Sequence, residues 1–169
     1  MTPDERPYPG LVYKPARFFK WREIACHHCG KFPPKDVIAS AEWAKFVQML
    51  DDARGRLGRP LAVSSWYRCP YHPIELEKHK HHHVDPGGAR PYARAYRGPH
   101  QTGFAVDLPM DSHSGMLIVL QVVLTRSMSM NRNAGVGISR RPGAHFVHVD
   151  WAECDEMCTS IRPAIWTYP

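Results

Sequence analysis

The sequence HFVHVDW occupies residues 145–151 and alternates apolar and polar side chains from its third residue onward. Such alternation is typical of a β-strand, whose successive side chains point to opposite faces of a sheet. His148 and Asp150 therefore share one face of the expected strand. Val147 and Val149 share the other face, which we expect to pack in the core.

A second segment, HQTGFAVDL at residues 100–108, contains similar residue types. From Gly103 onward it predicts a strand that carries Asp107, and His100 lies just before that strand. Zinc binds neutral imidazole nitrogens and carboxylate oxygens, and catalytic zinc sites use three protein ligands and a water. If the two strands are neighbours, His100, Asp107 and His148 form a metal site. The alternative that the spacing leaves open is three unrelated polar residues on a sheet.

The remaining patterns predict helices and short strands in mixed order. Apolar residues recur at three- and four-residue steps over residues 36–57, which indicates a helix with one apolar face. A second helix is expected from Asp111 or Ser112, either of which could cap it, to about residue 128. Two further strands are expected at 61–68 and 134–139. We infer an α+β fold, with a small antiparallel sheet and helices packed on one side.

Length and composition favour one globular domain over residues 1–169. Residues 1–17 are expected to form an extended arm, and residues 69–99, rich in Pro, Gly and His, a long loop insertion. Hydrophobic residues make up 43% and charged residues 22% of the chain, which excludes a disordered chain and a coiled coil. No apolar run approaches the roughly 20 residues of a membrane helix, and the N-terminus lacks the apolar core of a signal peptide. We therefore expect a protein made in the cytoplasm without a signal peptide.

Four segments together resemble the zinc D-alanyl-D-alanine carboxypeptidase family, which includes vancomycin-resistance D,D-peptidases and phage endolysins. The matching residues are, in chain order, Ser65-Trp66-Tyr67-Arg68, then His100, Gly103, Ala105 and Asp107, then Gly135-Val136-Gly137, then Phe146-Val147-His148-Val149-Asp150. Their order and spacing both match the family pattern. The segment from Glu23 to Cys26 is also similar to the start of one branch of this family.

The resemblance implies a hedgehog/DD-peptidase-like fold and a single zinc peptidase domain. His100, Asp107 and His148 would be the Zn²⁺ ligands, and a water would fill the fourth position. Zinc would lower the pKa of that water and polarise the scissile carbonyl. Arg68 would hold a substrate carboxylate or stabilise the developing oxyanion, since a guanidinium stays charged and binds two oxygens at once. Ser65 and Tyr67 would bind substrate beside it.

The general base is the point where this chain departs from the family pattern. Many members carry Glu or Asp three residues before the last histidine ligand, where this chain has His145. An imidazole can act as a base near neutral pH. Asp150 is the alternative base, or it orients His148 from behind. Two further departures are Gly98 and Pro73, where the family pattern has Ser and Asn.

Cysteines and a histidine run offer further metal-binding side chains. Cys26-His-His-Cys29 has the spacing of half a zinc knuckle, which Cys154 and Cys158 could complete as a four-thiolate site. The alternatives are disulfides, a local clasp or free thiols, and Cys69 is expected to be buried or to be the odd thiol. The run formed by His79 and residues 81–83 is expected to be a solvated insertion that binds divalent metals weakly.

The leading expectation is a monomeric zinc-dependent peptidase that hydrolyses peptidoglycan peptide. The bond would be D-Ala-D-Ala, cut by a carboxypeptidase, or of the L-Ala-D-Glu type, cut by an endopeptidase. The net charge of +6 fits an anionic wall target and a phage-encoded or virion-associated enzyme, although it equally fits simple solubility. The first alternative, motivated by His145, is a non-catalytic zinc-containing binding module of the same fold. The second is a basic nucleic-acid-binding zinc protein, which the scattered basic residues disfavour.

Overall fold

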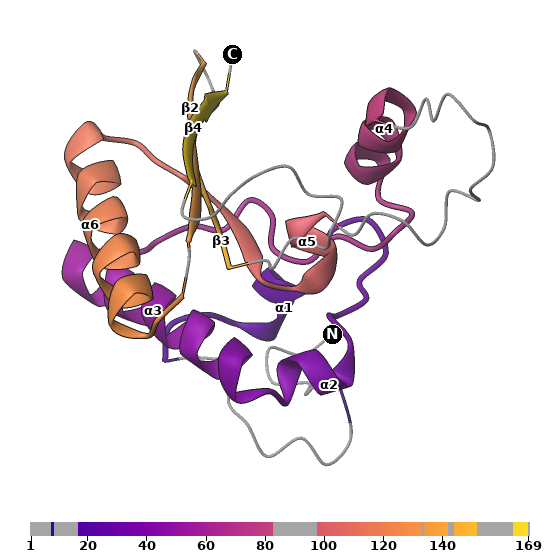
Figure 1. Cartoon of the computed structure of the whole chain (residues 1–169), viewed down its shortest axis with the longest axis horizontal. Helices are drawn as coiled ribbons and strands as arrows, with labels where there is room; N and C mark the ends of the chain where they lie inside the picture. Colours follow the sequence, from indigo (N-terminus) through magenta and orange to yellow (C-terminus); the bar gives the residue numbers. More distant parts are fainter. Residues whose placement is uncertain are drawn as a thin grey trace.

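The computed structural model describes residues 8, 17–82, 98–132, 134–141, 144–151 and 164–168. Figure 1 shows a small β-sheet with helices on its sides. The helices are α1 (Trp21–Ile24), α2 (Lys35–Ile38), α3 (Ala41–Leu57), α4 (Pro73–His82), α5 (Pro99–Thr102) and α6 (His113–Ser129). The strands are β1 (Ala105–Pro109), β2 (Gly135–Arg141), β3 (Ala144–Asp150) and β4 (Ala164–Tyr168). Apart from Tyr8 and residue 17, the arm expected at 1–17 lies outside the described residues.

The sheet has four strands in the order β1-β3-β2-β4. β3 pairs antiparallel with both β1 and β2, so the strands expected around residues 103–108, 134–139 and 146–151 are confirmed as neighbours. β4, which the sequence did not predict, pairs parallel with β2. The sheet is therefore mixed, and the prediction of a purely antiparallel sheet was wrong at this edge. The mixed α/β character of the fold is as expected.

Helices α3 and α6 lie side by side and cover one face of the sheet (Figure 1). The helix predicted over residues 36–57 is interrupted, because Ser40 begins a new helix by accepting a hydrogen bond from the backbone N–H of Trp43. Ser112 caps α6 in the same way, accepting from the N–H of Gly115. Val147 and Val149 of β3 are buried in the core with these helices, as their alternation predicted. The opposite face of β1 and β3 is thereby free to carry polar side chains.

The region between α3 and α5 differs from the prediction. Residues 61–68 form no strand, and only Ser65 makes a single β-bridge, with Asp107. The loop expected at 69–99 contains α4, which begins at Pro73. Proline is well tolerated in the first turn of a helix, where its missing N–H has no partner to lose. Figure 1 shows α4 on the side of the sheet away from α6.

Within the described part of the chain, no helix is long and apolar enough to span a membrane. The longest helices, α3 and α6, have 17 residues each and pack against one another in the core.

Candidate metal centre

His100, Asp107 and His148 meet on the polar face of β1 and β3. The strand register places Asp107 directly opposite His148, and α5 brings His100 against the pair. The Asp107 Oδ1 atom lies 2.8 Å from His148 Nδ1 and 3.3 Å from His100 Nε2, and these two nitrogens are 3.2 Å apart. All three side chains are buried. The cluster expected from the sequence is therefore present in the structure.

The outer nitrogen of each imidazole is hydrogen-bonded away from the cluster. His100 Nδ1 lies 2.5 Å from the backbone carbonyl oxygen of Trp66, an acceptor, so it carries the proton and donates. His148 Nε2 lies 3.1 Å from Asp150 Oδ2 and donates likewise. The inner nitrogens, His100 Nε2 and His148 Nδ1, are then the ones with lone pairs available. This arrangement of imidazoles backed by a carbonyl and a carboxylate is the one that orients metal-binding histidines, so the residues fit a bound metal ion.

The electrostatics of the cluster keep the carboxylate ionised. Burial alone would raise the pKa of Asp107, but hydrogen bonds and charge from His100 and His148 hold it well below its ordinary value. Burial lowers the pKa of His100 against the attraction of Asp107, so His100 is neutral. Burial would also lower the pKa of His148, but Asp107 and Asp150 raise it. The surroundings of His148 thus favour a positive charge at this point of the cluster.

Arg68 is built into the base of the cluster. Its Nη2 contacts Asp107 Oδ2, its Nη1 lies 3.4 Å from Glu75 Oε1, and its Nε donates to Ser65 Oγ at 2.8 Å. Only 7% of Arg68 is exposed. The guanidinium therefore faces two buried carboxylates, a role that the sequence analysis did not anticipate beside the expected substrate contact. Glu75 was missed because it belongs to α4, in a region expected to be a loop.

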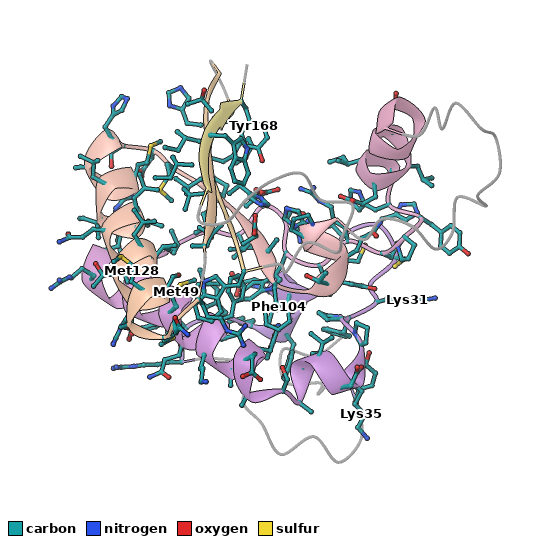
Figure 2. The ribbon with its side chains drawn as sticks, in the orientation of Figure 1. Lys31, Lys35, Met49, Phe104, Met128 and Tyr168 are labelled. Carbon is teal, nitrogen blue, oxygen red and sulfur yellow. The ribbon has the colours of Figure 1, made fainter. Side chains whose placement is uncertain are left out.

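Aromatic residues of β4 form the wall beside His148. The ring of Trp166 lies 5.6 Å from the ring of His148, and Tyr168, labelled in Figure 2, follows at 6.2 Å from Trp166. Burial, and to a lesser degree the charge of Asp107, raise the pKa of Tyr168 to about 12. Gly137 of β2 makes room for both rings, since a Cβ there would lie 2.6 Å from Tyr168 and 2.8 Å from Trp166. This wall was missed because β4 was not predicted.

Two expected site residues lie elsewhere. His145 is on the face of β3 opposite His148, is exposed, and has its ring 6.5 Å from that of His113 on α6. The structure does not bring it to the cluster. Tyr67 is buried against Cys26 and Cys69, where burial first and the neighbouring thiols second raise its pKa. Of the expected residues, the cluster contains His100, Asp107, His148, Asp150, Arg68 and Ser65.

In the described part of the chain, two groups of side chains have metal-binding geometry. One is the histidine centre formed by His100, Asp107 and His148, and the other consists of Cys26, Cys29 and Cys69. Cys69 thus joins the pair Cys26 and Cys29, which the sequence analysis had considered together with Cys154 and Cys158. Those two cysteines, and the side chains of the histidine run, lie outside the described residues.

Comparisons of the chain with protein-family models, with curated proteins and with solved structures found no match.

Proposed function

We propose that the chain is a zinc-dependent peptidase with a hedgehog/DD-peptidase-like fold that hydrolyses the peptide of bacterial peptidoglycan. The observation that carries the proposal is the buried histidine centre, in which one nitrogen of each imidazole faces the same carboxylate oxygen. Two imidazoles and a carboxylate are a donor set that zinc accepts. The order and spacing of the motifs resemble the wall peptidases, and this resemblance supplies the substrate class.

Each residue of the centre has a role in this proposal. His100, Asp107 and His148 would hold the ion, which when bound supplies a Lewis acid and an activated water. Trp66 and Asp150 keep the two imidazoles in the required tautomers. A substrate peptide would bind against the aromatic wall of β4, beside His148.

Arg68 is placed to contribute a permanent positive charge. Its guanidinium is buried and contacts Asp107 Oδ2, the carboxylate oxygen that points away from the histidines. A guanidinium cannot lose its charge in the physiological pH range. We assign it two functions, holding Asp107 in position and attracting the carboxylate of a peptide end or the oxyanion of the reacting carbonyl.

The position of His145 favours a second candidate, a metal-holding module that binds wall peptide without cutting it. His145 occupies the place of the acidic base in the family pattern, yet it lies on the far face of β3. Asp150, the other expected base, is fully buried and already accepts a hydrogen bond from His148. We therefore assign Asp150 to positioning His148. Turnover of substrate is the measurement that separates the two candidates.

The decisive experiment combines metal analysis with hydrolysis of purified peptidoglycan. Wild type should contain zinc and release new amino groups from the peptidoglycan. A chelator should abolish the release and added zinc should restore it. His148→Ala should lose both the metal of this centre and the activity. His113→Ala, which removes an exposed histidine outside the centre, is the matched control and should change neither.

The outcomes distinguish the candidates and the bond that is cut. Free D-alanine among the products identifies a carboxypeptidase, whereas new peptide amino termini identify an endopeptidase. Metal at the histidine centre without hydrolysis of any wall type supports the binding module. Iron also binds two imidazoles and a carboxylate, so iron in place of zinc, or no metal at all, contradicts the proposal.

A further inference from the structure

A second group of metal-binding side chains, made of three cysteines, lies apart from the histidine centre. Cys26 and Cys29 lie in the turn that follows α1, and Cys69 lies 43 residues beyond Cys26. Their Sγ atoms are within 4.8 Å of one another, and none of the three forms a disulfide. Cys26 and Cys69 are buried, whereas Cys29 is exposed at the surface. Three thiols from two distant segments thus converge on one point.

The turn that carries Cys26 and Cys29 is closed by its backbone. The Cys26 carbonyl accepts from the N–H of Gly30 at 2.7 Å, and the Cys26 N–H donates to the carbonyl of Lys31 at 2.8 Å. Gly30 has a φ of +71° with open space around it, so glycine is needed there for its backbone conformation. The Lys31 side chain, labelled in Figure 2, projects outward from the turn. The positions of Cys26 and Cys29 are therefore fixed by the backbone of a tight turn.

Backbone N–H groups surround the Cys26 sulfur. The N–H of Cys69 donates to Cys26 Sγ at 3.3 Å, which links the two segments directly. Burial alone would raise the pKa of the Cys26 thiol, but hydrogen bonds from the backbone of Cys69, His28 and Cys29 lower it. N–H groups that converge on one sulfur stabilise a thiolate, the form in which cysteine binds metals.

The arrangement suits a shared metal ion better than a disulfide. A disulfide joins two sulfurs and would leave the third without a role. Zinc–sulfur bonds are about 2.3 Å long, so sulfurs that share a tetrahedral zinc ion lie roughly 3.8 Å apart. Three sulfurs that all lie within 4.8 Å of one another are compatible with that separation.

We propose that Cys26, Cys29 and Cys69 bind a structural zinc ion, separate from the histidine centre and independent of the proposed peptidase function. Arg68 contacts Asp107 of the histidine centre, and the next residue, Cys69, supplies one of the three thiols. Both centres therefore contact the same stretch of chain, residues 66–69. That segment has no regular structure, and its backbone is held to Ile24 and His100 by hydrogen bonds of 3.2 Å each. A zinc ion at the cysteines fixes the segment that carries Arg68 and the Trp66 carbonyl.

Cobalt substitution of the full chain tests this proposal. Reduced wild type loaded with Co²⁺ should show the strong near-ultraviolet charge-transfer band of cobalt bound to thiolates, and the zinc form should contain two ions per chain. Cys29→Ser should lose most of the band and one zinc ion. Because Cys29 is exposed, this substitution disturbs the core least. His148→Ala should keep the band and lose the other ion.

The controls keep the result interpretable. His27→Ala, an exposed residue of the same turn, should keep both ions and the band. If Cys29→Ser does not fold, Cys29→His retains a zinc ligand and should recover the metal with a weaker thiolate band. Absence of the band from reduced wild type, or its full retention in Cys29→Ser, overturns the proposal. Since the histidine centre contains no thiol, failure of the peptidase proposal leaves the band unchanged.

Discussion

Arg68 and Asp107 form a buried ion pair in which the two oxygens of one carboxylate have different partners. Asp107 Oδ2 contacts the guanidinium, while Oδ1 faces His100 and His148. Because a guanidinium does not release its proton, a positive charge stays beside Asp107 whether or not a metal ion is bound. The pair therefore presents one anionic oxygen to the metal-binding nitrogens.

Removing Arg68 should destabilise the metal-free protein strongly. Arg68→Ala takes away the cation that faces both Asp107 and Glu75, two buried carboxylates. Breaking a buried ion pair from one side costs about 3–5 kcal/mol, and urea denaturation in the presence of a chelator measures it. Arg59→Ala breaks an exposed ion pair with Asp111 and is the matched control, with a much smaller expected loss. Equal losses in the two variants would contradict this role for Arg68.

The sequence predicted the histidine centre from two observations, the period of two in the strands that carry Asp107 and His148 and the family resemblance, which added His100 on α5. Alternation placed Asp107 and His148 on polar faces, and β1 and β3 pair directly. Residues 61–68 looked like a strand by composition, yet their backbone bonds to three different places. Ser64 bonds to Asp107, Tyr67 to Ile24, and Arg68 to His100. Local propensity cannot anticipate such dispersed partners.

The parts that the sequence analysis missed depend on contacts between distant segments. β4 pairs with β2, and nothing in its five residues signals that pairing. Cys69 joins Cys26 across 43 residues without a local motif. Pro73 begins α4, whereas the prolines of residues 69–99 predict a loop by composition. The separation of His145 from the centre follows from strand parity, because it is three residues from His148 and so lies on the opposite face. Its exposure does not follow from parity, since Val147 on that same face is buried.

Asp150→Asn should weaken metal binding at the histidine centre. Asp150 accepts from His148 Nε2 at 3.1 Å and is fully buried, so it fixes the tautomer that leaves Nδ1 free. Loss of such a supporting group typically costs about 10–100-fold in metal affinity. Competition with a chromogenic chelator measures the affinity. Asp111→Asn, which changes an exposed carboxylate outside the centre, is the control and should leave the affinity unchanged. An unchanged affinity in Asp150→Asn would show that Asp150 does not position His148.

Gly137→Ala should displace the aromatic wall. The new Cβ would approach Tyr168 to 2.6 Å and Trp166 to 2.8 Å, so β4 must shift or its rings must rotate. Overpacking of this kind costs roughly 1–3 kcal/mol, and tryptophan fluorescence with thermal unfolding should report it. Gly55→Ala in α3 meets only Phe18, at 3.9 Å, and should be neutral or stabilising. If Gly137→Ala is as stable as wild type, β4 does not pack as described.

We propose His72 as the fourth ligand beside the three sulfurs that the structure brings together, so His72→Ala should weaken zinc at the cysteine cluster. His72 follows Cys69 by the same interval that separates Cys26 and Cys29, and its ring lies 6.0 Å from that of His28. Burial first, and the charge of Arg68 second, lower the pKa of His72, which favours the neutral imidazole that binds metals. A tetrahedral zinc ion needs a fourth ligand. If His72 is the fourth ligand, His72→Ala should lose zinc to a chelator more readily than wild type, while His27→Ala should retain it. Equal retention in both variants excludes His72.

Metal affinity at the histidine centre should fall as the pH is lowered, beginning above the titration range of free imidazole. Burial would lower the pKa of His148, but hydrogen bonds to Asp107 and Asp150 raise it above its ordinary value of 6.5. A protonated His148 cannot bind a metal, so protons displace the ion while free imidazole would still be neutral. In Asp150→Asn one cause of the raised pKa is gone. The midpoint, the pH at which the affinity is half of the variant's own high-pH value, should therefore be lower, although that high-pH affinity is itself weaker. Metal titrations across neutral pH measure both midpoints, and a wild-type midpoint at or below that of Asp150→Asn contradicts this coupling.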